Sequence, residues 1–522
     1  MTKATTTIEL LHNTMFNFGG KIASSLAVLI LTPLIFHHLG AVQFGLWTLI
    51  LLLTGCLGAF DLGFSAALTK YVAEYNITKE QYRINTLFTV ALLFYLLFSV
   101  ILFVFLWKLR FSLFRFFSIP ELLWNKSQQI LPVAVLLFLF TSIANVFQNL
   151  INGLQKMFIT NSIIIFQSLL TVSLNILFLN LGYGLYGIVI ATLIVLFPSL
   201  LAFVIYSKRL MPELRLAIPF SDRNFLALLR FGLTVQIARL SGIIVTQADR
   251  IIIGHFLDLT MLAYYQLGYT IISAMRGIVL LLPSAVIPFT SELCTRKDSF
   301  RLKNLYFRGF KYSAIVSFCI AGLIITLAPI ITHLWLGTSN QTVVIVIQIL
   351  AVGHMLHLLT SMGTSMCEGL GKPGLEAKFS IWLMVLQLCF GIISIRIFGL
   401  LGILTSTSLV IAITSVVFLI RFQKSFESGQ LFSWHILILN PLSASIIASF
   451  FVLSFSKFFA SRVWNYSFGH LLAFLIQVGI FMVAYSYFLF LSGYIDTFDK
   501  NIVYRLSNSI KPIRFLVKKM KN

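Results

Sequence analysis

Apolar residues occur along this chain in uninterrupted runs of about twenty residues, separated by short polar connections. A run of this length lets an α-helix cross the hydrocarbon core of a bilayer, whereas alternating ten-residue segments are typical of a membrane β-barrel. Windows of about 19 residues predict fourteen spans, at 14–36, 42–69, 84–107, 130–151, 158–179, 184–206, 226–252, 262–291, 311–335, 341–366, 376–397, 400–421, 434–456 and 468–491. The pattern therefore predicts an all-α polytopic membrane protein.

Composition supports this interpretation and excludes a soluble protein. Of the 522 residues, 59% are hydrophobic and 10% are charged, against roughly 25% charged residues in ordinary soluble domains. The net charge of +22 would suggest a nucleic-acid partner in a soluble chain. Here we expect no such partner, because Lys and Arg gather in the cytoplasmic loops of membrane proteins.

The distribution of Lys and Arg predicts the orientation. With the N-terminus inside, cytoplasmic segments hold 27 Lys and Arg residues and external loops hold 7. This ratio predicts a multi-pass membrane protein with both termini in the cytoplasm. External residues 110–117 resemble a short amphipathic piece lying on the outer interface.

The chain repeats itself at a nearly constant offset. Phe18-Gly19 recurs as Phe231-Gly232 after 213 residues, Gly153 as Gly369 after 216, and Gly184-Leu-Tyr-Gly187 as Gly399-Leu-Leu-Gly402 after 215. Six spans per repeat give both repeats the same topology, related by an axis along the membrane normal. We predict two pseudo-symmetric six-helix bundles, residues 1–210 and 211–425, followed by two extra helices and a basic tail, residues 426–522.

Charged residues inside spans are costly and usually face a cavity or a partner. Lys21 and Asp61 lie on adjacent antiparallel spans at similar depths, roughly 10 and 12 Å from the cytoplasmic end. A structural salt bridge would explain the pair. The functional alternative is that Asp61 is the coupling-ion site and Lys21 its neutralising partner, which also contributes to substrate binding.

Arginines dominate spans seven and eight. Arg239 and Arg276 are expected near the midplane, and Arg250 shares a helix face with Arg239. Because Arg is always charged and binds phosphate through two parallel hydrogen bonds, these residues predict a cavity for an anionic ligand. Alternatively, some of them pair with carbonyl groups or with Asp61.

Motifs of other chemistries are missing from the sequence. It contains no Walker A sequence, no HExxH and no GxSxG in a suitable context. His354 and His357 share a helix face, but a metal site needs a third ligand nearby. We therefore expect a protein that is not an enzyme and that has no cofactor and no metal site.

Several motifs resemble those of a known family. They are Asn17-Phe18-Gly19, Phe44-Gly45-Leu46-Trp47, Asp61-Leu62-Gly63, Arg230-Phe231-Gly232, Asp249-Arg250 and Ala263-Tyr264-Tyr265. The chain is similar over nearly its whole length to bacterial polysaccharide and O-antigen flippases, the Wzx-like polysaccharide transporters of the multidrug/oligosaccharidyl-lipid/polysaccharide (MOP) flippase superfamily.

The resemblance implies transport of undecaprenyl-pyrophosphate-linked oligosaccharide from the cytoplasmic to the outer leaflet by alternating access. It also implies coupling to a proton or sodium gradient, contact with membrane lipids, and a glycan polymerase and chain-length protein as partners. Two alternatives remain open. A multidrug or metabolite exporter of the same superfamily would be expected to carry acidic residues in its cavity, and a membrane-embedded glycan polymerase would need a large external loop.

Overall fold

The computed structural model describes residues 3–57, 64–217, 242–284, 286–370, 374–425, 434–459 and 467–499. Every regular element in these ranges is helical. Among them, ten helices are long and apolar enough to cross a membrane. The predicted all-α polytopic class is confirmed, and the count of fourteen spans stays a prediction.

The described residues form two compact units, one comprising Met1–Leu281 and Pro373–Thr414, the other Leu282–Lys372 and Ser415–Asn522. The predicted boundaries at residues 210 and 425 stay predictions. The helices of the first unit before residue 258 are α1 (Lys3–Leu57), α2 (Phe64–Thr78), α3 (Gln81–Phe116), a short 3₁₀ helix (Glu121–Leu123), α4 (Trp124–Gly153), α5 (Met157–Asn180), α6 (Gly184–Leu210) and a helix over residues 242–256.

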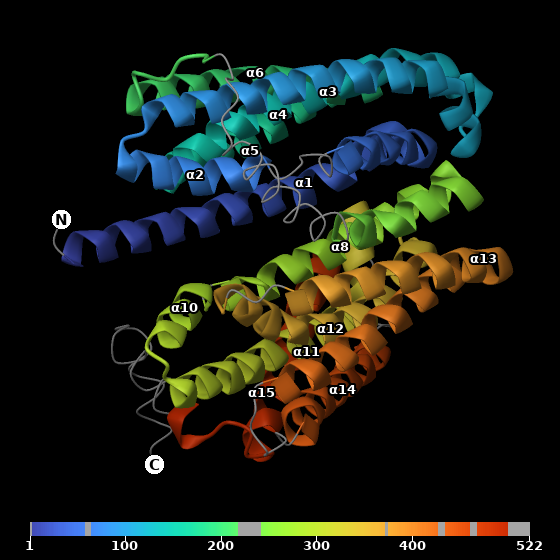
Figure 1. Cartoon of the computed structure of the whole chain (residues 1–522). Helices are drawn as coiled ribbons and strands as arrows, with labels where there is room; N and C mark the ends of the chain where they lie inside the picture. The colour runs from blue at the N-terminus through green and yellow to red at the C-terminus, as the bar shows by residue number, and fades with distance from the viewer. Residues whose placement is uncertain are drawn as a thin grey trace. The chain divides into compact units, whose positions relative to one another are not determined.

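In the first unit, α3, α4 and α6 run alongside one another, and α1 packs against α5 and against α8 (Leu259–Val279) (Figure 1). Aromatic and aliphatic side chains fill the interior of α2–α6, with Leu68, Val72 and Leu150 fully buried. Asp258 is the N-cap of α8, because its carboxylate accepts a hydrogen bond from the Met261 amide.

The second unit contains α9 (Leu281–Ser284), nearly all of which belongs to it, α10 (Ile287–Thr295), α11 (Ser299–Leu336), α12 (Gln341–Gly369), α14 (Trp434–Phe459) and α15 (Ser467–Leu491). α11 packs against α12, α14 and α15 (Figure 1). α13 (Gly374–Ser425) contributes most of its length to the first unit and its last turns to the second.

Two helices each cover more than one predicted span. α1 is kinked at Gly40 and α13 at Gly399, where φ is 71° and 58°. Glycine adopts such positive φ values without a steric penalty, so each kink falls where the sequence predicts the connection between two spans. Gly184, the repeat partner of Gly399, also has a positive φ of 53°. The shared conformation supports the predicted repeat.

Three helix boundaries differ from the sequence-based expectations. The predicted span 262–291 is broken into α8, α9 and α10, and Pro283, which lacks the amide hydrogen that would bond to the Val279 carbonyl, lies just after the first break. Residues 110–116 are not a separate interfacial piece, since they continue α3 to Phe116. The ninth span begins at Ser299 rather than at residue 311, which places Lys311 inside α11.

Candidate functional site

A buried carboxylate is the centre of a polar cluster in the first unit. Asp249, in the helix over residues 242–256, is only 3% exposed. Its Oδ2 accepts a hydrogen bond from the Tyr265 hydroxyl at 2.9 Å. Its Oδ1 accepts hydrogen bonds from Gln387 Nε2 and Thr407 Oγ1, both at 2.9 Å. Three helices therefore converge on this one acid, which we call the Asp249 cluster (Asp249, Tyr265, Gln387 and Thr407).

The same cluster contains an oxygen atom without a partner. Gln387 is 2% exposed, and its Oε1 is buried without a hydrogen bond. A buried acceptor left unpaired is costly, by about 1–3 kcal/mol. Carboxylate, amide and hydroxyl oxygens together are the donor set that hard cations prefer. The cluster can therefore hold a proton on Asp249, or a small cation once the Gln387 side-chain amide turns its oxygen toward the carboxylate.

Two of the predicted cationic residues meet at one tyrosine. The Arg250 guanidinium lies over the Tyr269 ring, 4.7 Å from its centroid, and Arg250 Nη1 donates a hydrogen bond to Gln247 Oε1 at 2.5 Å. Arg276 Nη1 donates to the Tyr269 hydroxyl at 3.3 Å. Both arginines and Tyr269 are half-buried. We call these three residues the arginine pair around Tyr269.

The two groups adjoin. Tyr265 and Tyr269 lie one turn apart on α8, and their rings stack with centroids 5.8 Å apart. Asp249 and Arg250 are neighbours in sequence. Four polar residues at three- and four-residue steps form a polar stripe on α8, and all of them are half-buried or exposed: Gln266, Tyr269, Ser273 and Arg276. The opposite face of α8 carries buried residues such as Ile271 and Met275.

The remaining predicted site residues are not brought together by the described parts of the chain. Lys21 is exposed on α1. Asp61 and Arg239 lie outside the described residues, so their roles stay predictions. Arg276 lies in the last turn of α8, where this helix ends, and not in the middle of one continuous span. His354 and His357 lie on α12 with ring centroids 6.3 Å apart, and the described residues contain no group of three metal-ligating side chains.

The sequence analysis missed an ion-pair cluster in the second unit. Lys311, 4% exposed on α11, donates a short hydrogen bond to Asp499 Oδ2 and lies 3.5 Å from Asp496 Oδ2. The Tyr312 hydroxyl donates to Asp499 Oδ1 at 2.6 Å, and Arg308 Nη1 lies 3.8 Å from the same oxygen. These residues, Arg308, Lys311, Tyr312, Asp496 and Asp499, form what we call the C-terminal latch, because they tie the segment after α15 to α11.

Burial and the partners of Asp499 shift the pKa of this acid in opposite directions. Burial by itself would raise the pKa of Asp499. Hydrogen bonds from Lys311 and Tyr312, together with the Lys311 charge, outweigh that effect and hold the pKa below its ordinary value of 3.8. The acid is therefore ionised at neutral pH and pairs with a buried ammonium group.

Comparison with known proteins gives one family match. A family model described as polysaccharide biosynthesis protein matches residues 10–294, more than half of the chain. An uncharacterized membrane protein of Methanocaldococcus jannaschii is 24% identical over 200 residues, which are 38% of this chain. The matched part of the chain spans 39% of that archaeal protein's length.

Solved structures share the fold at low sequence identity. Lipid II flippase MurJ, in an inward closed conformation, aligns with a TM-score of 0.69 at 14% identity, over 91% of this chain and 98% of MurJ. An inward-facing multidrug resistance transporter of the MATE family aligns at 0.58 and 18%, over 79% and 94% of the two chains. A MOP superfamily transporter from Pyrococcus furiosus aligns at 0.60 and 16%, over 80% and 95%. The fold is that of MOP superfamily transporters.

Proposed function

Because the chain belongs to the polysaccharide biosynthesis protein family, we propose that it is a flippase for lipid-linked oligosaccharide. Its substrate is undecaprenyl-pyrophosphate-linked repeat units, which it moves from the cytoplasmic to the outer leaflet of the bacterial inner membrane by alternating access. Cytoplasmic termini, and delivery of the repeat units to a glycan polymerase and a chain-length protein, are parts of the same proposal.

The observation that carries this proposal is the arginine pair around Tyr269. Arg276 lies on the polar stripe of α8, and Arg250 reaches Tyr269 on the same stripe. Both keep guanidinium hydrogens beyond the single hydrogen bond that each is seen to donate to a side chain. A pyrophosphate offers acceptor oxygens and negative charge, which guanidinium groups bind well. Arg239 is proposed as a third contact from the same face as Arg250, and Lys21 as a fourth nearer the cytoplasmic end.

The Asp249 cluster supports ion coupling as a second element of the proposal. A carboxylate buried among Gln387, Thr407 and Tyr265 changes its hydrogen-bonding needs when it takes up a proton or a sodium ion. Because Tyr265 stacks on Tyr269, such a change occurs one helical turn from the arginine pair. Asp61 remains the other proposed coupling residue, and the two acids are tested by the same assay.

The test is glycan display in cells that lack their own transporter, with variant levels checked in the membrane. We expect Arg276→Ala to reduce display strongly and Arg276→Lys to reduce it less, because Lys keeps the charge and loses only the planar fork. Arg209→Ala, which removes an exposed charge at the end of α6, is the matched control.

The coupling arm uses Asp249→Asn and Asp61→Asn. The Asn variant of the acid that couples transport should lose glycan display while its protein level stays normal. The Asn variant of the other acid should keep glycan display. Full display by Arg276→Ala and Arg239→Ala at normal levels would remove the arginines from the mechanism. Protection of cells from cationic drugs, without any glycan display, would indicate an exporter instead.

A further inference from the structure

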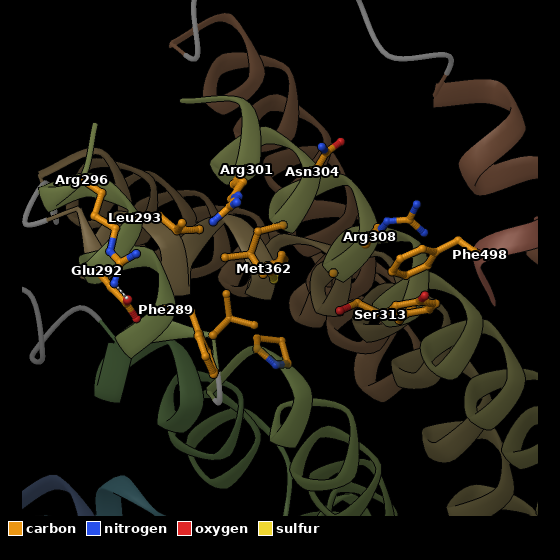
Figure 2. Close-up of a pocket in the computed structure, with 15 residues that line it drawn as sticks. Phe289, Glu292, Leu293, Arg296, Arg301, Asn304, Arg308, Ser313, Met362 and Phe498 are labelled. Atoms are coloured by element: carbon orange, nitrogen blue, oxygen red, sulfur yellow. Dashed lines mark ion pairs between the residues drawn. The ribbon is translucent and has the colours of Figure 1, made fainter. Parts of the chain in front are cut away.

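A cavity of about 780 Å³ lies within the second unit, separate from the Asp249 cluster. Residues of α9–α12 and Phe498 after α15 line it (Figure 2). One wall is apolar and includes Phe289, Leu293 and Met362. Three guanidinium groups, those of Arg296, Arg301 and Arg308, stand around the same space.

The arginines on the outer side of the cavity are only loosely neutralised. Arg296 pairs with Glu292 at 2.6 Å and Arg301 with Asp298 at 3.3 Å, but the two arginine side chains are 64% and 70% exposed. Ion pairs this exposed contribute about 0–1 kcal/mol, so a better anion can take over either guanidinium. Residues 292–311 together with 496–499 contain six Lys and Arg residues and four acids, which leaves the region cationic.

Two donors on the inner side of the cavity make no hydrogen bond. Arg308 Nη1 has only the long ion-pair contacts of the C-terminal latch, 3.6 Å to Asp496 and 3.8 Å to Asp499, and its guanidinium stacks on the Phe498 ring at 3.6 Å. Ser313 is fully buried, and its Oγ is also without a hydrogen-bond partner. Figure 2 shows the Ser313 side chain directed toward the middle of the cavity. Buried donors left unpaired are costly, which indicates that this space receives an acceptor.

We propose that this cavity binds a phosphate group carried on a lipid chain. Arg301 and Arg308 lie seven residues apart on one face of α11 and provide donors for the phosphate oxygens, with Ser313 donating from below. Phe289, Leu293 and Met362 cover the first carbons of the chain. A free phosphate would leave this apolar wall without a function. The predicted topology places the cavity on the cytoplasmic side, where anionic lipid headgroups are abundant.

The ligand chemistry can come from a membrane phospholipid or from an isoprenyl diphosphate, and a binding experiment separates the two sources. The full-length protein in detergent is titrated with phosphatidylglycerol, farnesyl diphosphate or inorganic pyrophosphate, and bound states are counted by native mass spectrometry. We expect saturable binding of at least one lipid probe and at least tenfold weaker binding of inorganic pyrophosphate. Preference for phosphatidylglycerol identifies a membrane lipid, and preference for farnesyl diphosphate identifies an isoprenyl ligand.

Variants show whether the bound lipid occupies this cavity. Arg301→Gln is expected to weaken binding about tenfold, as loss of a charge-assisted contact would. Leu293→Trp fills the space without changing charge and is expected to weaken binding by a similar factor. Lys297→Gln, an exposed charge on the same connection that does not line the cavity, is the matched control and is expected to bind like the unmodified protein.

The proposal is overturned if no lipid probe binds saturably, or if Arg301→Gln and Leu293→Trp bind as tightly as Lys297→Gln while melting like the unmodified protein. Equal affinity for inorganic pyrophosphate would also overturn it, because the apolar wall would then contribute nothing. Neither result bears on the flippase proposal, which depends on the arginine pair around Tyr269 in the other unit.

Discussion

The C-terminal latch provides a quantitative test of how the segment after α15 is held on α11. The perturbations are Lys311→Met and Asp499→Asn, singly and together. Lys311 is 4% exposed and Asp499 is 8% exposed, so each charge depends on its partner rather than on water. Met matches the length of the Lys side chain and Asn the shape of Asp, so packing changes little.

The expected magnitudes follow from the contacts that each variant leaves. Breaking a buried ion pair costs about 3–5 kcal/mol, because one charge stays behind unpaired. After Lys311→Met, Asp499 keeps Tyr312 at 2.6 Å and Arg308 at 3.8 Å, so we expect a loss of about 3 kcal/mol. After Asp499→Asn, Lys311 keeps Asp496 at 3.5 Å, so we expect about 2 kcal/mol. The double variant leaves neither charge behind, so it should cost about 1 to 2 kcal/mol, less than Lys311→Met alone.

The assay is denaturant unfolding of the purified protein in micelles, combined with hydrogen exchange of the peptide covering residues 492–499. Both single variants should speed exchange in that peptide. Arg83→Gln is the control, because it removes a short ion pair, 2.6 Å to Glu80, whose Arg83 side chain is 40% exposed. It should lower the free energy of unfolding by less than about 1 kcal/mol. The reasoning is refuted if the free energy of unfolding of each single variant lies within about 0.5 kcal/mol of that of the unmodified protein and hydrogen exchange in residues 492–499 is unchanged.

Three further predictions follow from the fold and the charges. Lowering the pH through and below 3.8 should loosen the latch, because a depressed Asp499 pKa gives stability that is complete above the ordinary value and is lost as the carboxylate takes up a proton. The protection of residues 492–499, measured against the exchange rate of the unfolded peptide at the same pH, should fall there, and unchanged protection would contradict it. A cysteine at His38, in a chain freed of its other cysteines, should react with an impermeant maleimide added outside intact cells, whereas labelling only from the cytoplasm would reverse the topology. Reversing the charges of Lys21 and Asp61 together should restore display that each single reversal removes, and a double variant no better than the singles would show that the two residues are uncoupled.

Hydropathy and glycine positions predicted the architecture well, because both act locally. The kinks at Gly40 and Gly399 fall at the predicted connections, and Gly184 and Gly399 share a positive φ as the repeat predicts. The family expected from the motifs is confirmed by the match over residues 10–294. The break in span eight was missed because a window average reports mean hydropathy and takes no account of the missing amide hydrogen of Pro283.

The polar clusters could not be predicted in the same way, because their members are far apart in sequence. Lys311 and Asp499 are 188 residues apart, and the hydropathy window placed Lys311 at the very edge of the ninth span. A window reports average polarity, whereas α11 buries Lys311 by extending beyond the apolar run and pairing it with a distant acid. The one available signal was Asp496 and Asp499, two acids spaced three residues apart at the end of a strongly basic chain.

Asp249 and Arg250 show how one helix separates opposite charges for two purposes. Neighbouring residues on a helix point about 100° apart, so the carboxylate is buried against Gln387 and Thr407 while the guanidinium reaches Tyr269. The partners of Asp249 are 138 and 158 residues away on α13, which is why the sequence alone gave it no role. A proton or cation at Asp249 would alter the bonds from α13 and the Tyr265 hydroxyl together. Since Tyr265 stacks on Tyr269, the proposed coupling and substrate sites share a contact on α8 and need no long pathway between them.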